Sequence, residues 1–350
     1  TNEDVFGNAD LEPEKVAKYN VGIDFGIANQ LQVSFDAFKE KMNNGLCRST
    51  AKIPSYQGIS LGSFPVTNIG EFENKGWELA VSYSKRFNAD FGMNLAGHLD
   101  YNKNKVIYIG EAAYDDTYAY AYRSEGYPYG QSWGYLVDWS NGNGLYNFQD
   151  EIDCGPTYTF GTPRLGDIKY QDLNNDGEIN EKDKAPLGYG ALPRYNFAFN
   201  AGFTYKNFEL NMLFQGVGKY SRNYLSLISN TASYEGMFSD SHLGAWTAEK
   251  WLNDEEITFP ALCASATTNN TTNDYLLRDA SFIRLKNVEL AYKMPKKVCD
   301  FMNASSFKVF LAGQNLFTID GIKEKDMPVE GDYNSFPICR MYRVGINIAF

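Results

Sequence analysis

The chain has 350 residues, 43 of them acidic and 32 basic, which gives a formal net charge of −11. This balance argues against a nucleic-acid partner, because such proteins present a clustered basic face. No apolar run reaches the length of about 18 residues that a transmembrane helix needs. Aromatic residues nevertheless make up 15% of a chain whose mean hydropathy is −0.42, a combination that suits strands with one lipid-facing side.

Apolar and polar residues alternate with a period of two along the predicted elements, which is typical of strands with one apolar face. The pattern is clear at the end of the chain, where Tyr342, Val344, Ile346, Ile348 and Phe350 alternate with polar or small residues. In chain order, the segments with this pattern are 19–26, 31–37, 77–83, 91–101, 195–205, 208–214, 283–292, 307–315 and 342–350. The sequence therefore predicts nine strands.

The connections between these strands alternate between short and long. Short turns are predicted at Ala28–Gln30, Asn88–Asp90 and Lys206–Asn207, with a short connection over 295–305. Long loops are predicted over Asn43–Lys75, Ile107–Pro193, Ser221–Ala280 and Lys323–Pro337. A compact soluble domain rarely carries several structureless loops longer than about 15 residues. A transmembrane antiparallel β-barrel has short periplasmic turns and long extracellular loops, so we expect this all-β fold.

The number of strands suggests that the chain is part of a larger barrel. If Phe350 ends in the periplasm, nine strands place Thr1 outside, and an odd number of strands does not close a bacterial barrel in the usual way. Residues 1–350 are therefore expected to be the C-terminal portion of one barrel domain. The same topology places Cys47, Cys154, Cys263 and Cys339 at the extracellular end and Cys299 at the periplasmic end. Spacing alone fixes no disulfide among these five cysteines.

Several segments together resemble the C-terminal part of SusC-type (SusC/RagA-like) TonB-dependent outer-membrane transporters. These segments are Leu11–Lys15, Tyr19–Phe25, Asn74–Leu79, Gly166–Asp172, Leu277–Val288 and Gly313–Thr318. One departure is Ala280, at a position where glycine is commoner in the family. The segments are spread over nearly the whole chain, which makes the resemblance specific.

The resemblance implies a 22-stranded barrel whose plug domain and N-terminal strands lie outside these residues. It implies import of glycans or peptides through the outer membrane, energised by the TonB complex, with a SusD-like surface lipoprotein as a lid. Lipid and lipopolysaccharide would surround the barrel. The alternative from another class is a soluble calcium-stabilised β-protein that binds carbohydrate.

A cluster of acidic residues in the second long loop fits a calcium-binding pattern. Asp172, Asn174, Asp176, Glu178 and Asp183 occupy positions 1, 3, 5, 7 and 12 of such a loop, with Gly177 at position 6. Calcium prefers oxygen ligands, and this spacing supplies them around a tight turn. We therefore expect a structural calcium ion here. Aspartate at position 12 reaches less far than glutamate, and an acidic turn without metal is the alternative.

Aromatic residues gather just before this acidic loop. They are Tyr127, Tyr129, Trp133, Tyr135 and Trp139. Flat rings of this kind stack on sugars or pack at protein interfaces, so these residues are candidates for contact with substrate or lid. Packing of the loop against its own barrel is the equal alternative.

The sequence predicts no catalytic residues. Gly58–Gly62 matches the G-x-S-x-G pattern of a nucleophile elbow, but Phe64–Pro65 follows and no helical periodicity does. We therefore expect a protein that is not an enzyme.

Overall fold

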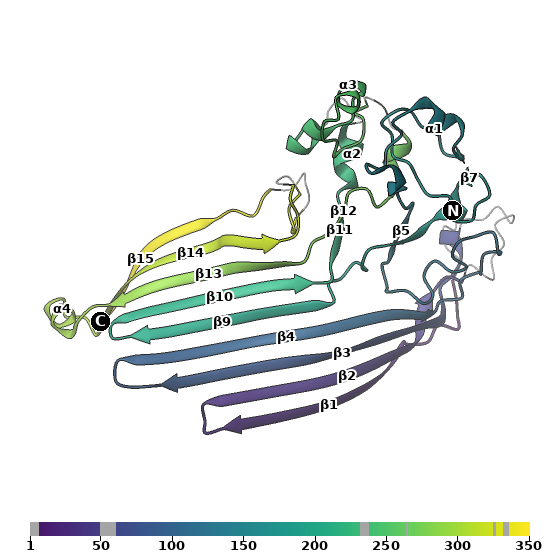
Figure 1. Ribbon diagram of the computed structural model, residues 1–350. Coiled ribbons are helices and arrows are strands. Elements are labelled where there is room, and N and C mark those ends of the chain that lie inside the picture. Colours follow the sequence, from purple (N-terminus) through teal and green to yellow (C-terminus); the bar gives the residue numbers. More distant parts are fainter. Residues whose placement is uncertain are drawn as a thin grey trace, which may run out of the picture.

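The computed structural model describes residues 7–49, 61–231, 238–263, 265, 267–324, 327–331 and 336–350. Within these residues, nine strands form one antiparallel sheet, and each pairs with the next of the nine along the chain (Figure 1). The strands of this main sheet are β1 (Lys15–Ile27), β2 (Leu31–Cys47), β3 (Thr67–Arg86), β4 (Phe91–Tyr108), β9 (Tyr195–Tyr205), β10 (Phe208–Gly218), β13 (Phe282–Lys293), β14 (Ser306–Asp320) and β15 (Met341–Ala349). The nine predicted strands are confirmed, and β1 and β15 form the two edges of the sheet.

The hairpin turns explain why these strands pair in register. Ala28 and Asn29 have φ values of 52° and 53°, and the Gln30 backbone N–H donates to the Ile27 carbonyl at 2.9 Å. Two central residues with positive φ give a turn that matches the right-handed twist of the flanking strands. The turn between β3 and β4 instead uses the side chain of Asn88 as an acceptor for nearby backbone N–H groups.

The first long loop is shorter than the sequence predicted. β2 continues to Cys47 and β3 already begins at Thr67, so the boundaries predicted at Asn43–Lys75 are wrong. Strand pairing continues past the point where the apolar alternation stops, and it reaches Cys47 opposite Thr67. Charged side chains replace apolar ones in this part of the sheet. The Lys39 ammonium, for example, lies 2.8 Å from the Glu73 carboxylate.

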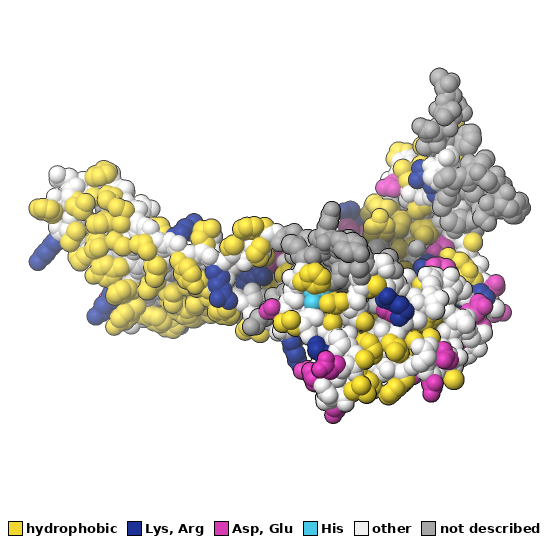
Figure 2. All heavy atoms as spheres, turned by 90° about the horizontal axis from the view of Figure 1, so that it is seen from above, with side chains coloured by type: hydrophobic (Ala, Val, Ile, Leu, Met, Phe, Trp, Pro, Cys, Tyr) yellow, Lys and Arg dark blue, Asp and Glu magenta, His cyan; other side chains and the backbone are white. Residues whose placement is uncertain are grey.

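The two faces of the main sheet differ in chemistry. Residues that lie directly opposite each other in neighbouring strands share a face. One row contains Phe35, Leu79, Leu99 and Phe197, and the next row on the opposite face contains Ser34, Ala80, His98 and Ala198. Figure 2 shows hydrophobic side chains gathered over the strand part of the molecule, whereas acidic side chains gather at the loop end. The alternation of the sequence therefore produces one apolar and one mainly polar face.

The long connections gather at one end of the main sheet and contain short elements of their own (Figure 1). These elements are β5 (Ser132–Gly134), β6 (Thr157–Tyr158), β7 (Glu178–Ile179), β8 (Ala185–Leu187), β11 (Ser221–Asn223), β12 (Leu277–Asp279), α1 (Gln149–Asp153), α2 (Leu225–Thr231) and α3 (Ala248–Leu252). We call the described residues of 109–194, 219–281 and 321–331 the loop unit.

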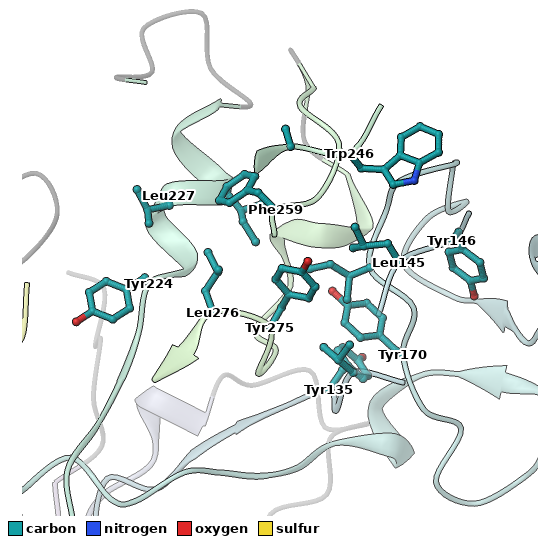
Figure 3. Packing of buried hydrophobic residues seen from close by; sticks show 14 of the residues in the cluster. Tyr135, Leu145, Tyr146, Tyr170, Tyr224, Leu227, Trp246, Phe259, Tyr275 and Leu276 are labelled. Carbon is teal, nitrogen blue, oxygen red and sulfur yellow. The ribbon is translucent and has the colours of Figure 1, made fainter. Parts of the chain in front are cut away.

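The loop unit has an aromatic core (Figure 3). Its buried side chains include Tyr135, Leu145, Tyr146, Ile168, Tyr170, Tyr224, Leu227, Trp246, Phe259, Tyr275 and Leu276. Several of the buried tyrosine hydroxyls have hydrogen-bond partners, as polar groups in a dry interior require. The Tyr146 and Tyr158 hydroxyls are hydrogen-bonded at 3.0 Å, and the Tyr170 hydroxyl donates to the Thr268 carbonyl at 3.0 Å. Segments that the sequence treats as separate loops thus pack into one body.

The opposite end of the main sheet carries the short turns and α4 (Lys296–Phe301). Cys299 lies buried in α4, whereas Cys47, Cys154, Cys263 and Cys339 lie at the loop end, as the sequence predicts. All five thiols are free in the structure. Among the described residues, no helix combines the length and the apolar character that spanning a membrane requires.

Candidate functional site

Three of the predicted calcium ligands, Asp172, Asn174 and Asp176, lie on one tight turn of the loop unit. The Asp172 carboxylate accepts hydrogen bonds from the backbone N–H groups of Asn175 at 2.7 Å and Gly177 at 2.8 Å. Asn175 and Gly177 have φ values of 59° and 85°, a region that glycine and asparagine tolerate better than other residues. This acidic loop, residues 172–183, is therefore folded around the side chain of its first aspartate.

Asn174 and Asp176 occupy the tip of the acidic loop. The Asn174 amide donates to the Asp176 carboxylate at 2.8 Å, and the Glu178 backbone N–H donates to the same carboxylate at 3.0 Å. These bonds, the first above all, hold the pKa of Asp176 below its usual value. The Lys182 ammonium lies 3.8 Å away and adds positive charge. The side chain of Glu178 is exposed.

Asp183 is the last residue of the acidic loop, and its side chain is fully buried. Its carboxylate accepts hydrogen bonds from the backbone N–H groups of Leu173 at 3.0 Å and Asn180 at 2.9 Å. Burial raises the pKa of Asp183 above its ordinary value, and the negative charge of Asp172 raises this pKa further. Among the described residues, no lysine or arginine forms an ion pair with Asp183.

The acidic loop offers oxygen donors of the kind that calcium binds. Its carboxylates, however, do not form a compact cluster. Asp172, Asn174 and Asp176 bring side-chain oxygens to one turn, and the buried carboxyl group of Asp183 has no ion-pair partner among the described residues. No group of three or more His, Cys, Asp or Glu side chains suited to a metal occurs in the described part of the chain. A bound cation would therefore rely on amide and carbonyl oxygens as well as carboxylates, which calcium accepts.

The predicted aromatic cluster is divided by the structure. Tyr127 and Trp133 pack edge to face with centroids 4.9 Å apart, and Tyr120 lies 5.5 Å from Trp133. Tyr135 is only 3% exposed and belongs to the core of the loop unit, so its ring is unavailable to a sugar or a lid. Tyr135 thus packs within the loop unit itself, against Phe160 and Tyr170.

Tyr129 and Trp139 remain accessible. Tyr129 is 70% exposed and makes one edge contact with Phe72 of β3, with centroids 6.3 Å apart. Trp139 is 48% exposed and stacks on Tyr275, with centroids 5.2 Å apart. The structure therefore leaves two of the five rings open to a ligand or partner, at separate places in the loop unit.

A tyrosine-rich segment that sequence reasoning missed covers the acidic loop. In residues 112–123, the Thr117 carbonyl accepts from the Asn174 amide at 2.8 Å, and the Ala119 backbone N–H donates to the Lys182 carbonyl at 2.9 Å. We call this segment the tyrosine flap. The density of tyrosines at positions 114, 118, 120 and 122 is the signal that could have marked it.

Arg123 fixes the tyrosine flap to the acidic loop. Its guanidinium donates to the Lys184 carbonyl at 3.1 Å and also to the Glu181 carbonyl. The same group lies over the rings of Tyr114 and Trp133, at 5.1 Å and 5.5 Å from their centroids. The Arg123 side chain therefore connects these aromatic rings to the acidic loop, through cation–π contacts on one side and hydrogen bonds on the other.

The Gly58–Gly62 pattern lies largely outside the described residues. His242 is buried in the loop unit, where its ring nitrogens contact Ser239 and the Leu227 carbonyl. Through these contacts, the His242 ring contributes to the packing of the loop unit.

Comparisons with known proteins agree with this architecture. Residues 1–316 match the family model "TonB dependent receptor-like, beta-barrel". TonB-dependent receptor P3 of Formosa agariphila is 27% identical over 99% of this chain and 35% of its own length. TonB-dependent receptor SusC of Bacteroides thetaiotaomicron is 25% identical over 98% of this chain and 32% of its own length. The chain thus spans about a third of the length of these relatives.

A solved structure has the same fold. The RagAB peptide transporter superposes with a TM-score of 0.69 and 19% identity, over 99% of this chain and 36% of the matched chain. Members of the matched family are outer-membrane β-barrel receptors, not enzymes. On the evidence of a family model that covers most of its residues, the chain belongs to the TonB-dependent receptor-like β-barrel family.

Proposed function

We propose that this chain forms the C-terminal part of a SusC-like barrel that imports glycans or peptides across the outer membrane. The observation that carries the proposal is the two-ended main sheet, with one apolar face, short turns at one end and a cored loop unit at the other. This is the arrangement of a lipid-embedded wall with a substrate-receiving outer mouth. The soluble alternative would leave the apolar face in water, and no observation favours it.

The edges of the main sheet support a larger barrel. β1 and β15 each pair on one side only, and every residue of β1 is exposed. Unpaired strand edges are not tolerated in hydrocarbon, because their backbone groups would lack hydrogen-bond partners. In the proposed receptor, further strands pair with both edges, and the rest of the receptor supplies the plug and the contact with TonB.

The surface of the loop unit suits a SusD-like lipoprotein lid. Leu243 and Leu252 expose 77% and 81% of their surfaces near α3, and Phe238 exposes 68%. Trp139 adds a flat ring with a polar edge. Exposed large apolar side chains of this kind mark interaction sites. In this proposal the lid contacts the leucines, while Tyr129 and Trp139 contact lid or substrate.

Calcium is the proposed ion of the acidic loop. Asp172, Asn174, Asp176, the Glu178 carbonyl and Asp183 would hold it. The ion would neutralise the buried charge of Asp183 and keep the tyrosine flap in place through Asn174 and Thr117. Its role is structural, since calcium with full ligation leaves little room for substrate.

The test is uptake by cells that produce the receptor. Fluorescently labelled oligosaccharides and peptides should accumulate, and a protonophore should abolish this accumulation. Leu243→Asp with Leu252→Asp should reduce co-purification of the surface lipoprotein. Phe301→Asp, an equally exposed site in α4 at the other end of the sheet, is the matched control. Accumulation of neither class, or accumulation that ignores the protonophore, contradicts the proposal.

A further inference from the structure

A row of like charges crosses the apolar face of the main sheet near the loop end. Lys39 of β2 lies directly opposite Lys75 of β3, and Lys75 lies directly opposite Lys103 of β4. Like charges that face each other across strands destabilise a sheet unless something compensates them. Such a row therefore favours the binding of an anion.

The next row outward only partly compensates these charges. It contains Lys41, Glu73 and Lys105 in register on β2, β3 and β4. Glu73 lies 2.8 Å from Lys39 and 3.8 Å from Lys75, and Glu71 lies 3.1 Å from Lys41. With five lysines against these two glutamates, three positive charges remain in excess.

Lys103 is the clearest case of a cation without compensation. Its side chain is exposed, and it forms no hydrogen bond or ion pair with any residue that the structure describes. Lys39 and Lys75 also keep more than half of their side-chain surface exposed. The five ammonium groups, which we call the lysine band, therefore remain accessible on a chain whose net charge is −11.

The position of the lysine band identifies the kind of anion. The next row toward the middle of the sheet holds three aromatic rings in contact, Trp77, Tyr101 and Tyr195, with centroid separations of 6.2 Å and 4.9 Å. Behind these rings begins the apolar row of Leu79, Leu99 and Phe197. Aromatic rows of this type mark the boundary between hydrocarbon and headgroups. The lysine band thus lies at headgroup level, on the side of the long loops.

We propose that the lysine band binds the phosphate groups of a phosphorylated glycolipid in the outer leaflet of the membrane. Its acyl chains would lie against the apolar row, and its phosphates would contact Lys39, Lys75 and Lys103. Ammonium groups bind phosphate through charge-assisted hydrogen bonds. A soluble anion would not need an adjoining apolar wall. The inference rests on the proposed location of the chain in the outer membrane.

The experiment measures lipid binding by the whole receptor that contains this chain, purified in detergent, with native mass spectrometry. The probes are diphosphorylated lipid A, its dephosphorylated form and inorganic phosphate. Lys39→Gln, Lys75→Gln and Lys103→Gln together should lower the affinity for diphosphorylated lipid A by at least about tenfold, because each lysine near anionic headgroups contributes roughly a fivefold factor. The corresponding arginine variant should retain binding. The control replaces three exposed lysines at the short-turn end of the main sheet, Lys206, Lys296 and Lys297, by glutamine. This control variant should bind lipid A as the wild type does.

Three results would overturn the inference: unchanged binding by the triple glutamine variant, equal binding of dephosphorylated lipid A, or complete displacement by millimolar inorganic phosphate. If the triple variant does not fold, Lys103→Gln alone provides the test, because this side chain has no partner to lose. Membrane insertion and uptake are measured separately. A protein that inserts and imports normally, yet shows any of these results, refutes only the lysine band.

Discussion

Phe199 and Asn200 are neighbours in β9, yet their side chains lie on opposite faces of the main sheet. Phe199 lies opposite Gly97 and Phe214 and is 43% exposed on the apolar face. Asn200 lies opposite Ala96 on the face that carries Ser82. In a membrane barrel, the face with Phe199 would contact lipid and the face with Asn200 would line the lumen.

Exchange of each residue for arginine should therefore have opposite consequences. Phe199→Arg is expected to cost roughly 2–4 kcal/mol of folding free energy if the site lies near the middle of the membrane. Asn200→Arg should be tolerated, because the new charge would face water. Refolding into lipid vesicles, followed by heat-dependent gel mobility, measures both. Equal effects would contradict the assignment of faces.

The loop unit should be sensitive to mutation of its core and insensitive at its surface. Leu145 is fully buried in the core, and Leu145→Ala is expected to destabilise the loop unit by about 2–5 kcal/mol. Leu252→Ala is the matched control, since Leu252 is exposed, and should change stability by less than about 0.5 kcal/mol. Pulse proteolysis in detergent reports on the loop unit. Equal resistance of both variants would indicate that the loops do not share a core.

The strands and their order could be predicted from sequence because the information is local. The alternation over 195–205 and 208–214, together with the turn at Lys206, corresponds closely to β9 and β10. The ends of β2 and β3 were missed for a physical reason. Lys39 and Glu73 pair across the strands, and a charged pair carries no apolar alternation that a single strand could display.

The loop unit could not be predicted, because its contacts join residues far apart in the chain. The Ile168 backbone N–H donates to the Asn269 side chain at 2.7 Å, and the Val137 backbone N–H donates to Asp274 at 2.8 Å. Neither pair has a signature in spacing. The same limit applies to Tyr135, because the sequence around a loop tyrosine does not show whether its ring packs inward or contacts a ligand. The acidic loop was visible because its spacing is short and regular.

Thiol labelling should report the sidedness of the chain. Cys154 and Cys339 are exposed at the loop end and should react with a membrane-impermeant maleimide on intact cells. Cys299 is buried, so its silence would be uninformative, and Lys297→Cys in the exposed part of α4 replaces it as the probe. The introduced thiol should react only after lysis. Labelling of Lys297→Cys from outside, with Cys154 protected, would reverse the topology.

Of the two half-buried thiols at the loop end, Cys263 should react faster than Cys47. A backbone hydrogen bond from Ser265 lowers the pKa of Cys263, and the Arg164 guanidinium, 2.9 Å from the sulfur, acts in the same direction. Burial raises the pKa of Cys47 instead. Since the thiolate is the reactive form, Cys263 should outpace Cys47 at neutral pH, and Arg164→Gln should slow it. Rates follow from mass spectrometry of single-cysteine variants, and equal rates would contradict this prediction.

Acid should affect the acidic loop differently with and without calcium. Because the pKa of Asp183 is raised in the folded chain, its contribution to stability is fully present below the unfolded value of about 3.9 and is lost as the pH rises through the folded value. In chelator, the loop should therefore tighten on mild acidification. With calcium, acid should loosen it, because protons compete for the ligands. Hydrogen exchange across residues 172–183 measures both trends, and identical pH profiles would exclude a calcium-linked carboxylate.

Removal of calcium should open the acidic loop without disturbing the main sheet. Asp172 and Asp183 place two negative charges close together, and without a cation their repulsion should loosen the loop and release the tyrosine flap held by Asn174. The measurement is protease nicking between Pro163 and Gly188, with and without chelator. Wild type should be nicked faster in chelator, and Asp176→Ala should be nicked fast in both conditions.

Asp150→Ala is the matched control for this experiment, since Asp150 is an exposed aspartate of α1 outside the acidic loop. This variant should behave like the wild type, and barrel insertion should be unchanged in all three proteins because the main sheet makes no use of the ion. Nicking that is the same before and after chelation would show that Asp172 and Asp183 are held by the backbone N–H groups of the turn alone. The acidic loop would then be a metal-independent support for the tyrosine flap.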